Sequence, residues 1–400
     1  MYRKLILACL LLNGCQHLPS EPDRSSSQIP VFDGHSDFAI HYARAQPGWS
    51  ATALDVTEGL PGQADLPRWR SGGVFGMLAT VGSDRGPGAP DPFARLNVAL
   101  DWADALAARH PDSIMLARTV QDLRRARSSG RIGLMLAIEG GDHIEGSIEK
   151  LRQAYSRGVR SMLIVYDHHN DLGDGAMVLE QSRSIARPAH DGLSQLGRAV
   201  VAEMNRLGML VDLSHASEET ANEAIALSTA PVIFSHSAAR ALADTPRNLS
   251  DSTLRSLRAN GGVAMVPLAP YLVTTRHWRW WSSGERRYAE LLATHSTDEA
   301  AVRQGMEAWD RANPQPEVNV AMVADQIEHI ANVAGRDHVG IGSDFDGMGD
   351  FSINGLEHAG LLQALMSELR RRGWSERELV ALGSGNFERV LARVEATRRR

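Results

Sequence analysis

The stretch VFDGHSD (residues 31–37) is an apolar run that ends in a His-x-Asp pair, directly after a serine-rich linker. Because residues i and i+2 of a strand point to the same side, His35 and Asp37 are expected to project an imidazole and a carboxylate together. Such a pair can hold a metal ion. A barrel of parallel strands would bring other strand ends to the same face. Four later strand-like runs end in residues suited to metal binding or acid-base chemistry: Glu139, His215, His236 and Asp344.

Short apolar runs alternate with helical patterns from residue 31 onward. Most runs lack polar alternation, as expected of parallel strands buried on both faces. The segments between them have apolar residues three and four apart, which predicts crossover helices and a parallel sheet. Eight strands indicate a (β/α)8 TIM-type barrel. The predicted strands are 31–37, 73–80, 132–139, 161–166, 210–215, 231–236, 262–268 and 338–344, and the clearest helices are 148–156, 192–207, 218–227, 249–258 and 318–334.

Two insertions interrupt the barrel pattern. Residues 91–127, after the second strand, carry two helical patterns, and residues 271–315, after the seventh, contain Trp278-Arg279-Trp280-Trp281. Long loops after barrel strands lie on the active-site face, so the second insertion is interpreted as a lid or substrate wall, or as a packing subdomain. An open doubly wound sheet is the alternative fold, but no Gly-x-Gly-x-x-Gly turn follows the first strand.

Composition limits the class of protein. The chain has 400 residues, of which 43% are hydrophobic and 22% charged, enough to form a large core. A formal charge of −6 gives no basic face to expect, which argues against a nucleic-acid-binding protein.

Residues 1–15 have the features of an export signal. A basic start precedes an apolar run at 5–12 that is too short to span a bilayer. The following Leu-Asn-Gly-Cys resembles a bacterial lipobox, in which the cysteine is lipidated. Cleavage would leave Cys15 as the only thiol, so no internal disulfide could form. We expect export to the bacterial cell envelope, a lipid anchor on Cys15 that faces the periplasm, a polar tether at 16–30 and one folded domain at 31–395.

The strand-end residues favour a metal site. Glu139 ends an apolar run, so in an enclosed site its carboxylate must be paired or bound to metal. His215 and His236 each follow a serine after consecutive apolar strands, a joint occurrence that favours metal binding. Five nitrogen and oxygen ligands without a thiolate suit two Zn²⁺ ions, and Mn²⁺ or Co²⁺ also fits the ligand types. Asp344 is placed to take a proton from water and pass it to a leaving amine.

These motifs together resemble the membrane (renal-type) dipeptidase family of the amidohydrolase-like barrels. The resemblance runs from about residue 31 to about residue 391 and implies hydrolysis of dipeptides, commonly including those with a C-terminal D-residue. The motifs, in order, are His35-x-Asp37, Glu139-Gly-Gly, Val211-Asp212-Leu213-Ser214-His215, residues 231–237, Pro246-Arg247-Asn248-Leu249 and residues 340–347.

The resemblance also implies roles for individual positions. His35 and Asp37 would hold one zinc ion, His215 and His236 the other, and Glu139 would bridge the two. Asp344 would be the acid-base group. Arg247 matches the arginine that holds the substrate carboxylate, a task that suits its fork of donors.

Composition supports this branch of the barrels. Many relatives bridge their metals with a carboxylated lysine at the end of the fourth strand. Lys150, the only lysine beyond the signal, lies in a helical pattern before that strand. Glu139 is therefore the best candidate for the bridge, and related deaminases typically open with His-x-His rather than with His-x-Asp.

One position departs from the family pattern. After the fourth strand the family usually has a histidine that polarises the scissile carbonyl, but here Tyr166 occupies that position. A phenol can also donate a hydrogen bond to an oxyanion, so activity can survive the exchange, but the exchange puts the substrate range in doubt. His168 or His169 is an alternative donor.

Rival functions are a metallohydrolase of another small amide, such as a lactam or an N-acyl amino acid, and a scaffold without catalysis. A homodimer is a further expectation.

Overall fold

The computed structural model describes residues 28–40, 56–57, 62–83, 91–176, 190–295 and 298–399, so the predicted lipidation site Cys15 lies outside it. Its strands are β1 (Val31–Ser36), β2 (Val74–Ser83), β3 (Ile114–Leu116), β4 (Ile132–Glu139), β5 (Val159–Leu163), β6 (Leu210–Asp212), β7 (Ile233–Phe234), β8 (Val263–Val266) and β9 (Val339–Ile341). Its α-helices in the described ranges are α2 (Leu66–Gly72), α3 (Pro92–Arg109), α4 (Val120–Ser128), α5 (Ile148–Arg157), α6 (Gln195–Leu207), α7 (Glu218–Leu227), α8 (Asp251–Asn260), α9 (Pro270–Val273), α10 (Thr275–Thr294), α11 (Glu299–Ala312), α12 (Val320–Ala334), α13 (Leu362–Arg371), α14 (Glu376–Val380) and α15 (Asn386–Ala396).

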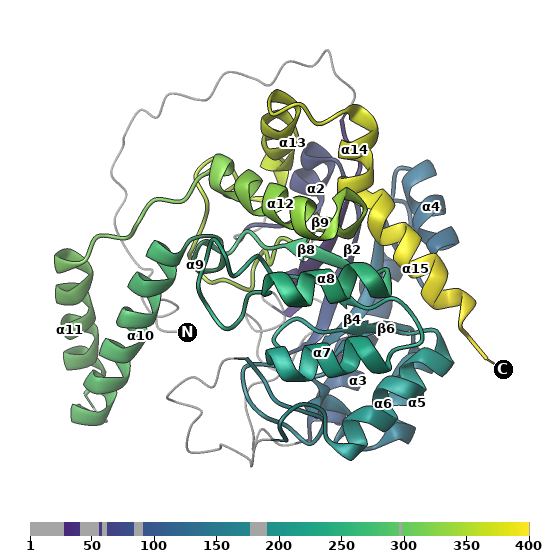
Figure 1. Cartoon of the computed structure of the whole chain (residues 1–400), viewed down its shortest axis with the longest axis horizontal. Coiled ribbons are helices and arrows are strands. Elements are labelled where there is room, and N and C mark those ends of the chain that lie inside the picture. Colours follow the sequence, from purple (N-terminus) through teal and green to yellow (C-terminus); the bar gives the residue numbers. More distant parts are fainter. Residues whose placement is uncertain are drawn as a thin grey trace.

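Eight parallel strands form a nearly closed barrel surrounded by helices (Figure 1). The strands pair in the order β1-β2-β4-β5-β6-β7-β8-β9, which confirms the predicted (β/α)8 fold. β3 was not predicted. It pairs Ile114 with Ile132 beside the start of β4, and its three residues are too few to give a periodic pattern.

The seam between β9 and β1 closes next to the predicted site. The backbone N–H of Asp344 donates to the carbonyl of His35 at 3.0 Å. Below this bond the buried carboxylate of Asp33 accepts hydrogen bonds from the N–H and the hydroxyl of Ser343, at 2.7 and 2.5 Å. The same contacts that close the barrel therefore fix the backbone of two site residues.

The helices α5 to α8 begin for a common local reason. Each follows a serine whose side chain accepts a hydrogen bond from a backbone N–H of the first turn, which satisfies one of the unpaired donors there. The four capping residues are Ser147, Ser194, Ser217 and Ser250.

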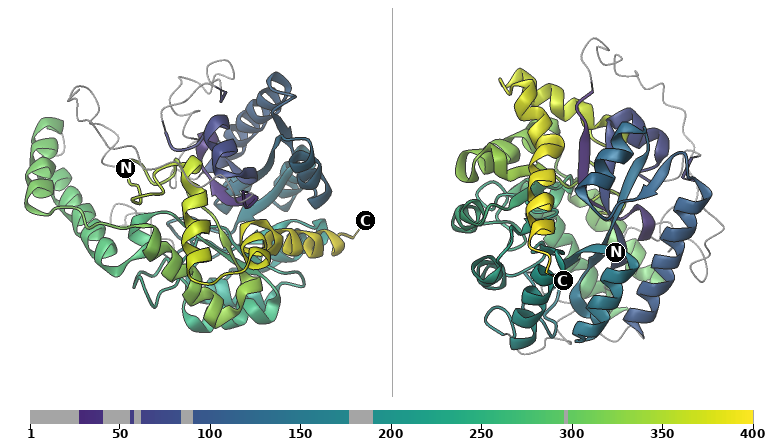
Figure 2. Two further views of the ribbon diagram at one scale, coloured as in Figure 1. Left: turned by 90° about the horizontal axis from the view of Figure 1, so that it is seen from above. Right: turned by 90° about the vertical axis from the view of Figure 1, so that its right-hand side faces the viewer.

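The two ends of the barrel are covered differently. α15 crosses the end where the strands begin and faces the viewer in the right-hand view of Figure 2. Phe387 of α15 stacks on Phe32 of β1, with ring centroids 3.9 Å apart. α10 and α11 project from the barrel at the left of Figure 1. Among the described residues, no helix is both long and apolar enough to cross a membrane.

We predict that Asn386→Ala destabilises the fold by about 2–4 kcal/mol, because it leaves two carbonyl groups without donors. The buried Asn386 amide donates to Arg336 O and Val339 O at 2.7 and 2.8 Å, and so ties α15 to β9. The free energy of unfolding in urea measures the change. The exposed Asn332→Ala is the control and should stay within about 0.5 kcal/mol of the parent. Equal stabilities of the two variants would contradict this role.

Candidate active site

The predicted site residues lie at the carboxyl ends of the strands: His35 and Glu139 within the last two residues of β1 and β4, and the others just beyond their strands. β6 ends at Asp212 and β7 at Phe234, so His215 and His236 follow their strands by a few residues instead of ending them. His215 has a φ of 69° and Asp344 a φ of 62°. Residues other than glycine seldom adopt this left-handed region, and they cluster at functional sites when they do.

Glu139 lies at the centre of the site. Its Oε1 is 3.3 Å from His35 Nε2, 3.4 Å from His215 Nε2 and 3.6 Å from His236 Nε2. The Nε2 atoms of His215 and His236 are 3.0 Å apart. Strands far apart in the sequence therefore direct three imidazoles at one carboxylate oxygen, so the structure brings these four predicted residues together.

Two further carboxylates complete the cluster. Asp37 Oδ1 lies 3.4 Å from His35 Nε2. Two overlapping groups each offer three ligand atoms within 4.8 Å of one another: His35 with Glu139 and His236, and His35 with Asp37 and Asp344. Gly347 permits this approach, because a Cβ there would lie 2.3 Å from Asp344 Oδ1 and 2.9 Å from Asp37 Oδ2.

The electrostatics of the cluster follow from burial and opposite charges. Burial opposes a charged His35, but the Glu139 and Asp37 carboxylates raise its pKa well above the ordinary value. Burial, reinforced by positively charged neighbours, lowers the pKa of His236 well below its ordinary value. Burial raises the pKa of Asp344 to about 7, and the charges of Asp37 and Glu139 act in the same direction. A carboxylate in that range can both accept and donate a proton near neutral pH.

The donor set fits a metal ion. Within the described part of the chain, the buried atom Glu139 Oε2 has no hydrogen-bond partner. Buried polar atoms are normally satisfied, and imidazoles that converge on carboxylates leave room for a cation to satisfy them. Lys150 instead pairs with Glu145 at the start of α5, away from the cluster.

Arg247 is buried on the loop between β7 and α8. Its Nη1 donates to Ser237 Oγ at 2.6 Å and its Nη2 to the His236 carbonyl at 3.1 Å. These bonds hold the Arg247 guanidinium beside His236. Among the described residues no carboxylate pairs with it, so three of its five N–H donors can bind a ligand.

The ring of Tyr166 lies in the site, with its centroid 4.4 Å from that of His215. Burial raises its pKa well above the ordinary value, so its hydroxyl keeps its proton. The alternative histidines point elsewhere: His168 Nε2 lies 3.2 Å from Asp142 and His169 Nδ1 lies 3.0 Å from Asp174.

Two further site residues were not predicted. Asp167 Oδ1 lies 2.7 Å from His215 Nδ1 and so fixes the orientation of the ring through the nitrogen that does not face Glu139. Its position directly after Tyr166 was an available signal. Tyr271 of α9 is half-buried, and the charges of Asp344 and Asp167 reinforce the effect of its loss of solvent in raising its pKa. Its ring stacks on Trp281 at 5.0 Å, so the second insertion supplies a wall of the site as well as packing. No spacing in the sequence linked this tyrosine to the site.

Comparisons with known proteins agree with this geometry. Residues 23–400 match the membrane dipeptidase family, peptidase family M19. The chain belongs to this family. It is 34% identical to Dipeptidase aclJ of Aspergillus oryzae, over 92% of this chain and 79% of that protein, and 31% identical to Dipeptidase 3 of Rattus norvegicus, over 92% and 66%. It is therefore a metal-dependent hydrolase of the dipeptidase type.

Solved structures of relatives share the fold. Dipeptidase AC, an M19 metallopeptidase, superimposes with a TM-score of 0.72 at 26% identity and covers 92% of this chain and 99% of its own. A metallopeptidase from Rhodobacter sphaeroides, liganded with a phosphinate mimic of the dipeptide L-Ala-D-Ala, gives 0.71 at 25% identity over 92% and 100%.

We predict that Asp167→Asn weakens metal binding by about 10–100-fold, because an amide holds the His215 ring less firmly than a carboxylate does. Metal titration of the chelator-treated protein measures the affinity directly. The exposed Asp244→Asn, on the loop that carries Arg247, is the matched control and should bind metal like the parent. An unchanged affinity in Asp167→Asn would show that this carboxylate does not position the ligand.

Proposed function

We propose that this chain is a dinuclear zinc dipeptidase whose substrates include dipeptides with a C-terminal D-residue. The observation that supports this most is the position of Glu139 Oε1 among three imidazole nitrogens, with Asp37 beside His35. His35 and Asp37 would hold one ion, His215 and His236 the other, with Glu139 shared. Two Zn²⁺ ions would supply Lewis-acid polarisation of the scissile carbonyl and activation of a water; Mn²⁺ or Co²⁺ suits the same ligands.

The side chains divide the remaining tasks. Asp344, buried beside the metal ligands, takes the proton of the attacking water and delivers it to the leaving amine. The Tyr166 hydroxyl donates a hydrogen bond to the oxygen on which negative charge develops. Arg247 holds the free carboxylate of the substrate, which restricts the enzyme to short peptides because a longer chain has no carboxylate at that distance.

A C-terminal D-residue is supported by a relative of known structure. The metallopeptidase of Rhodobacter sphaeroides binds a mimic of L-Ala-D-Ala. The alternative, a hydrolase of another small amide such as a lactam or an N-acyl amino acid, is favoured by Tyr166, which stands where the family usually has histidine.

The proposal extends to the location of the enzyme. The apolar run before Cys15 supports export and a lipid anchor in the bacterial envelope, with the enzyme facing the periplasm.

We predict that Asp344→Asn lowers kcat by about a thousandfold or more, because the amide cannot carry the proton. Metal content, determined by elemental analysis, should stay at the parent value. Turnover near the parent rate with metal retained would remove Asp344 from the mechanism.

We also predict that Arg247→Lys lowers kcat/KM for free dipeptides by about 10–100-fold, because lysine cannot form the two-pronged contact with a carboxylate. Dipeptide amides, which lack that carboxylate, serve as the control substrates and should lose little. The panel should contain L-L and L-D dipeptides, N-acyl amino acids and lactams. Cleavage of the N-acyl compounds or lactams in preference to free dipeptides would replace the proposed substrate class by the alternative.

A further inference from the structure

The end of the barrel closed by α15 carries a concentration of positive charge. α4 and α15 lie side by side there, joined by an ion pair between Arg124 and Glu388 at 2.9 Å. We call residues 118–131 and 386–399 the basic face. They contain nine arginines and three acidic residues, a formal charge of +6, in a chain whose total is −6. The expectation that the chain has no basic face is therefore wrong, because the fold brings two arginine-rich segments side by side.

Three arginines of the basic face are available for an external partner. Arg127, Arg393 and Arg398 are exposed and, within the described ranges, form no ion pair. Two of them instead lie over aromatic rings, Arg127 over Phe75 at 5.5 Å and Arg398 over Tyr155 at 5.8 Å. The three acidic residues are already engaged: Asp122 pairs with Arg125, Glu388 with Arg124, and Glu395 accepts from the Val120 N–H.

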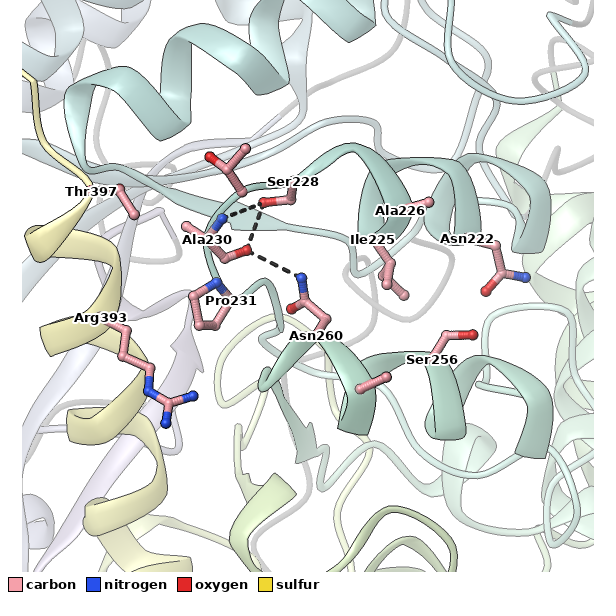
Figure 3. A pocket seen from close by; sticks show the side chains of 12 residues that line it. Asn222, Ile225, Ala226, Ser228, Ala230, Pro231, Ser256, Asn260, Arg393 and Thr397 are labelled. Atoms are coloured by element: carbon pink, nitrogen blue, oxygen red, sulfur yellow. Dashed lines mark hydrogen bonds between the residues drawn. The ribbon is translucent and has the colours of Figure 1, made fainter.

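An open groove adjoins the basic face between α7, α8 and α15 (Figure 3). Its volume is about 650 Å³, and Arg393 of α15 is one of the residues that line it. Of the described residues that line it, none is acidic. The hydroxyl and amide groups of Ser256, Thr229 and Asn222 lie in the lining with Arg393. A shallow site with one arginine and several neutral hydrogen-bonding groups suits a phosphate ester.

The chain enters the barrel at this same end. Pro30 lies beside the π-helical segment Ala381–Gly385 that precedes α15, because a Cβ on Gly383 would be 2.5 Å from the Pro30 carbonyl. Twelve residues separate Cys15 from Gln28, the first described residue. Such a segment reaches at most about 45 Å. A lipid on Cys15 would thus keep this end of the barrel near a bilayer, with the metal ligands at the opposite end.

We propose that the basic face is a docking surface for an anionic phospholipid bilayer, with the groove at Arg393 receiving a lipid phosphate. The surface is charged, has a neutral polar groove, and adjoins the point from which the N-terminal segment leaves. Docking in this orientation turns the carboxyl ends of the strands away from the membrane, so small peptides can reach the site. Docking through the basic face needs neither a bound metal nor an acyl chain on Cys15, so it can be tested without either.

The test uses the chain that begins at Gln16, which keeps every described residue but lacks the apolar run and Cys15. Sedimentation with vesicles of phosphatidylcholine containing phosphatidylglycerol measures binding, with pure phosphatidylcholine as the neutral comparison. The parent should bind the anionic vesicles and lose binding as salt shortens the range of the charges. The variant Arg127→Glu, Arg393→Glu, Arg398→Glu should bind at least about tenfold more weakly.

A matched triple variant distinguishes an effect of the basic face from an effect of the total charge of the chain. Arg276→Glu, Arg279→Glu, Arg311→Glu makes the same change on the exposed side of α10 and α11 and should bind vesicles like the parent. Both variants should keep the parent unfolding midpoint and dipeptide kcat/KM. Three results would overturn the proposal: no preference for anionic vesicles, equal loss in the two variants, or binding of the parent to DNA but not to vesicles.

Discussion

The site depends on one buried carboxylate, that of Glu139, held within 3.3–3.6 Å of three imidazole nitrogens. A charge enclosed in this way is costly unless opposite charge accompanies it. The carboxylates of Glu139 and Asp37 raise the pKa of His35, so without a metal a proton on this ring supplies part of that charge. The Nε2 atoms of His215 and His236 lie 3.0 Å apart, so either a shared proton or a metal ion must separate their lone pairs.

Other buried carboxylates hold this arrangement in place without joining it. Asp212 Oδ1 accepts hydrogen bonds from the N–H groups of Ser214 and Ser235, each at 3.1 Å. Ser214 in turn accepts a bond at 3.0 Å from the N–H of His236. The loops that carry the two histidines therefore share one buried anchor, just as Asp33 and Ser343 anchor the seam beside His35. Removing such an anchor would move several ligands at once, because they are coupled through the backbone.

The sequence was sufficient to predict the strands and helices that have a periodic or continuous apolar pattern, and the polar residues that end an apolar run. All eight barrel strands, and the six residues that the structure gathers in the candidate site, could be predicted because burial on both faces leaves continuous apolar runs, and the polar residue after each run stands out. β3 was missed because three residues make no pattern. Tyr271 was missed because its partners Asp344 and Asp167 meet it only through the fold of the second insertion. The basic face was missed because total charge says nothing about where arginines gather.

The gathering of arginines has the same cause as the gathering of ligands. In a parallel barrel every strand ends, and every following helix begins, at the same face, so the helices end at the opposite face. Helix ends favour basic side chains because of their partial negative charge. The last turns of α4, α5, α6 and α8 carry Arg127, Arg157, Arg206 and Arg258. The topology that directs carboxylates and histidines to the catalytic face thus collects positive charge at the far end, where it can act on a partner without disturbing the metal site.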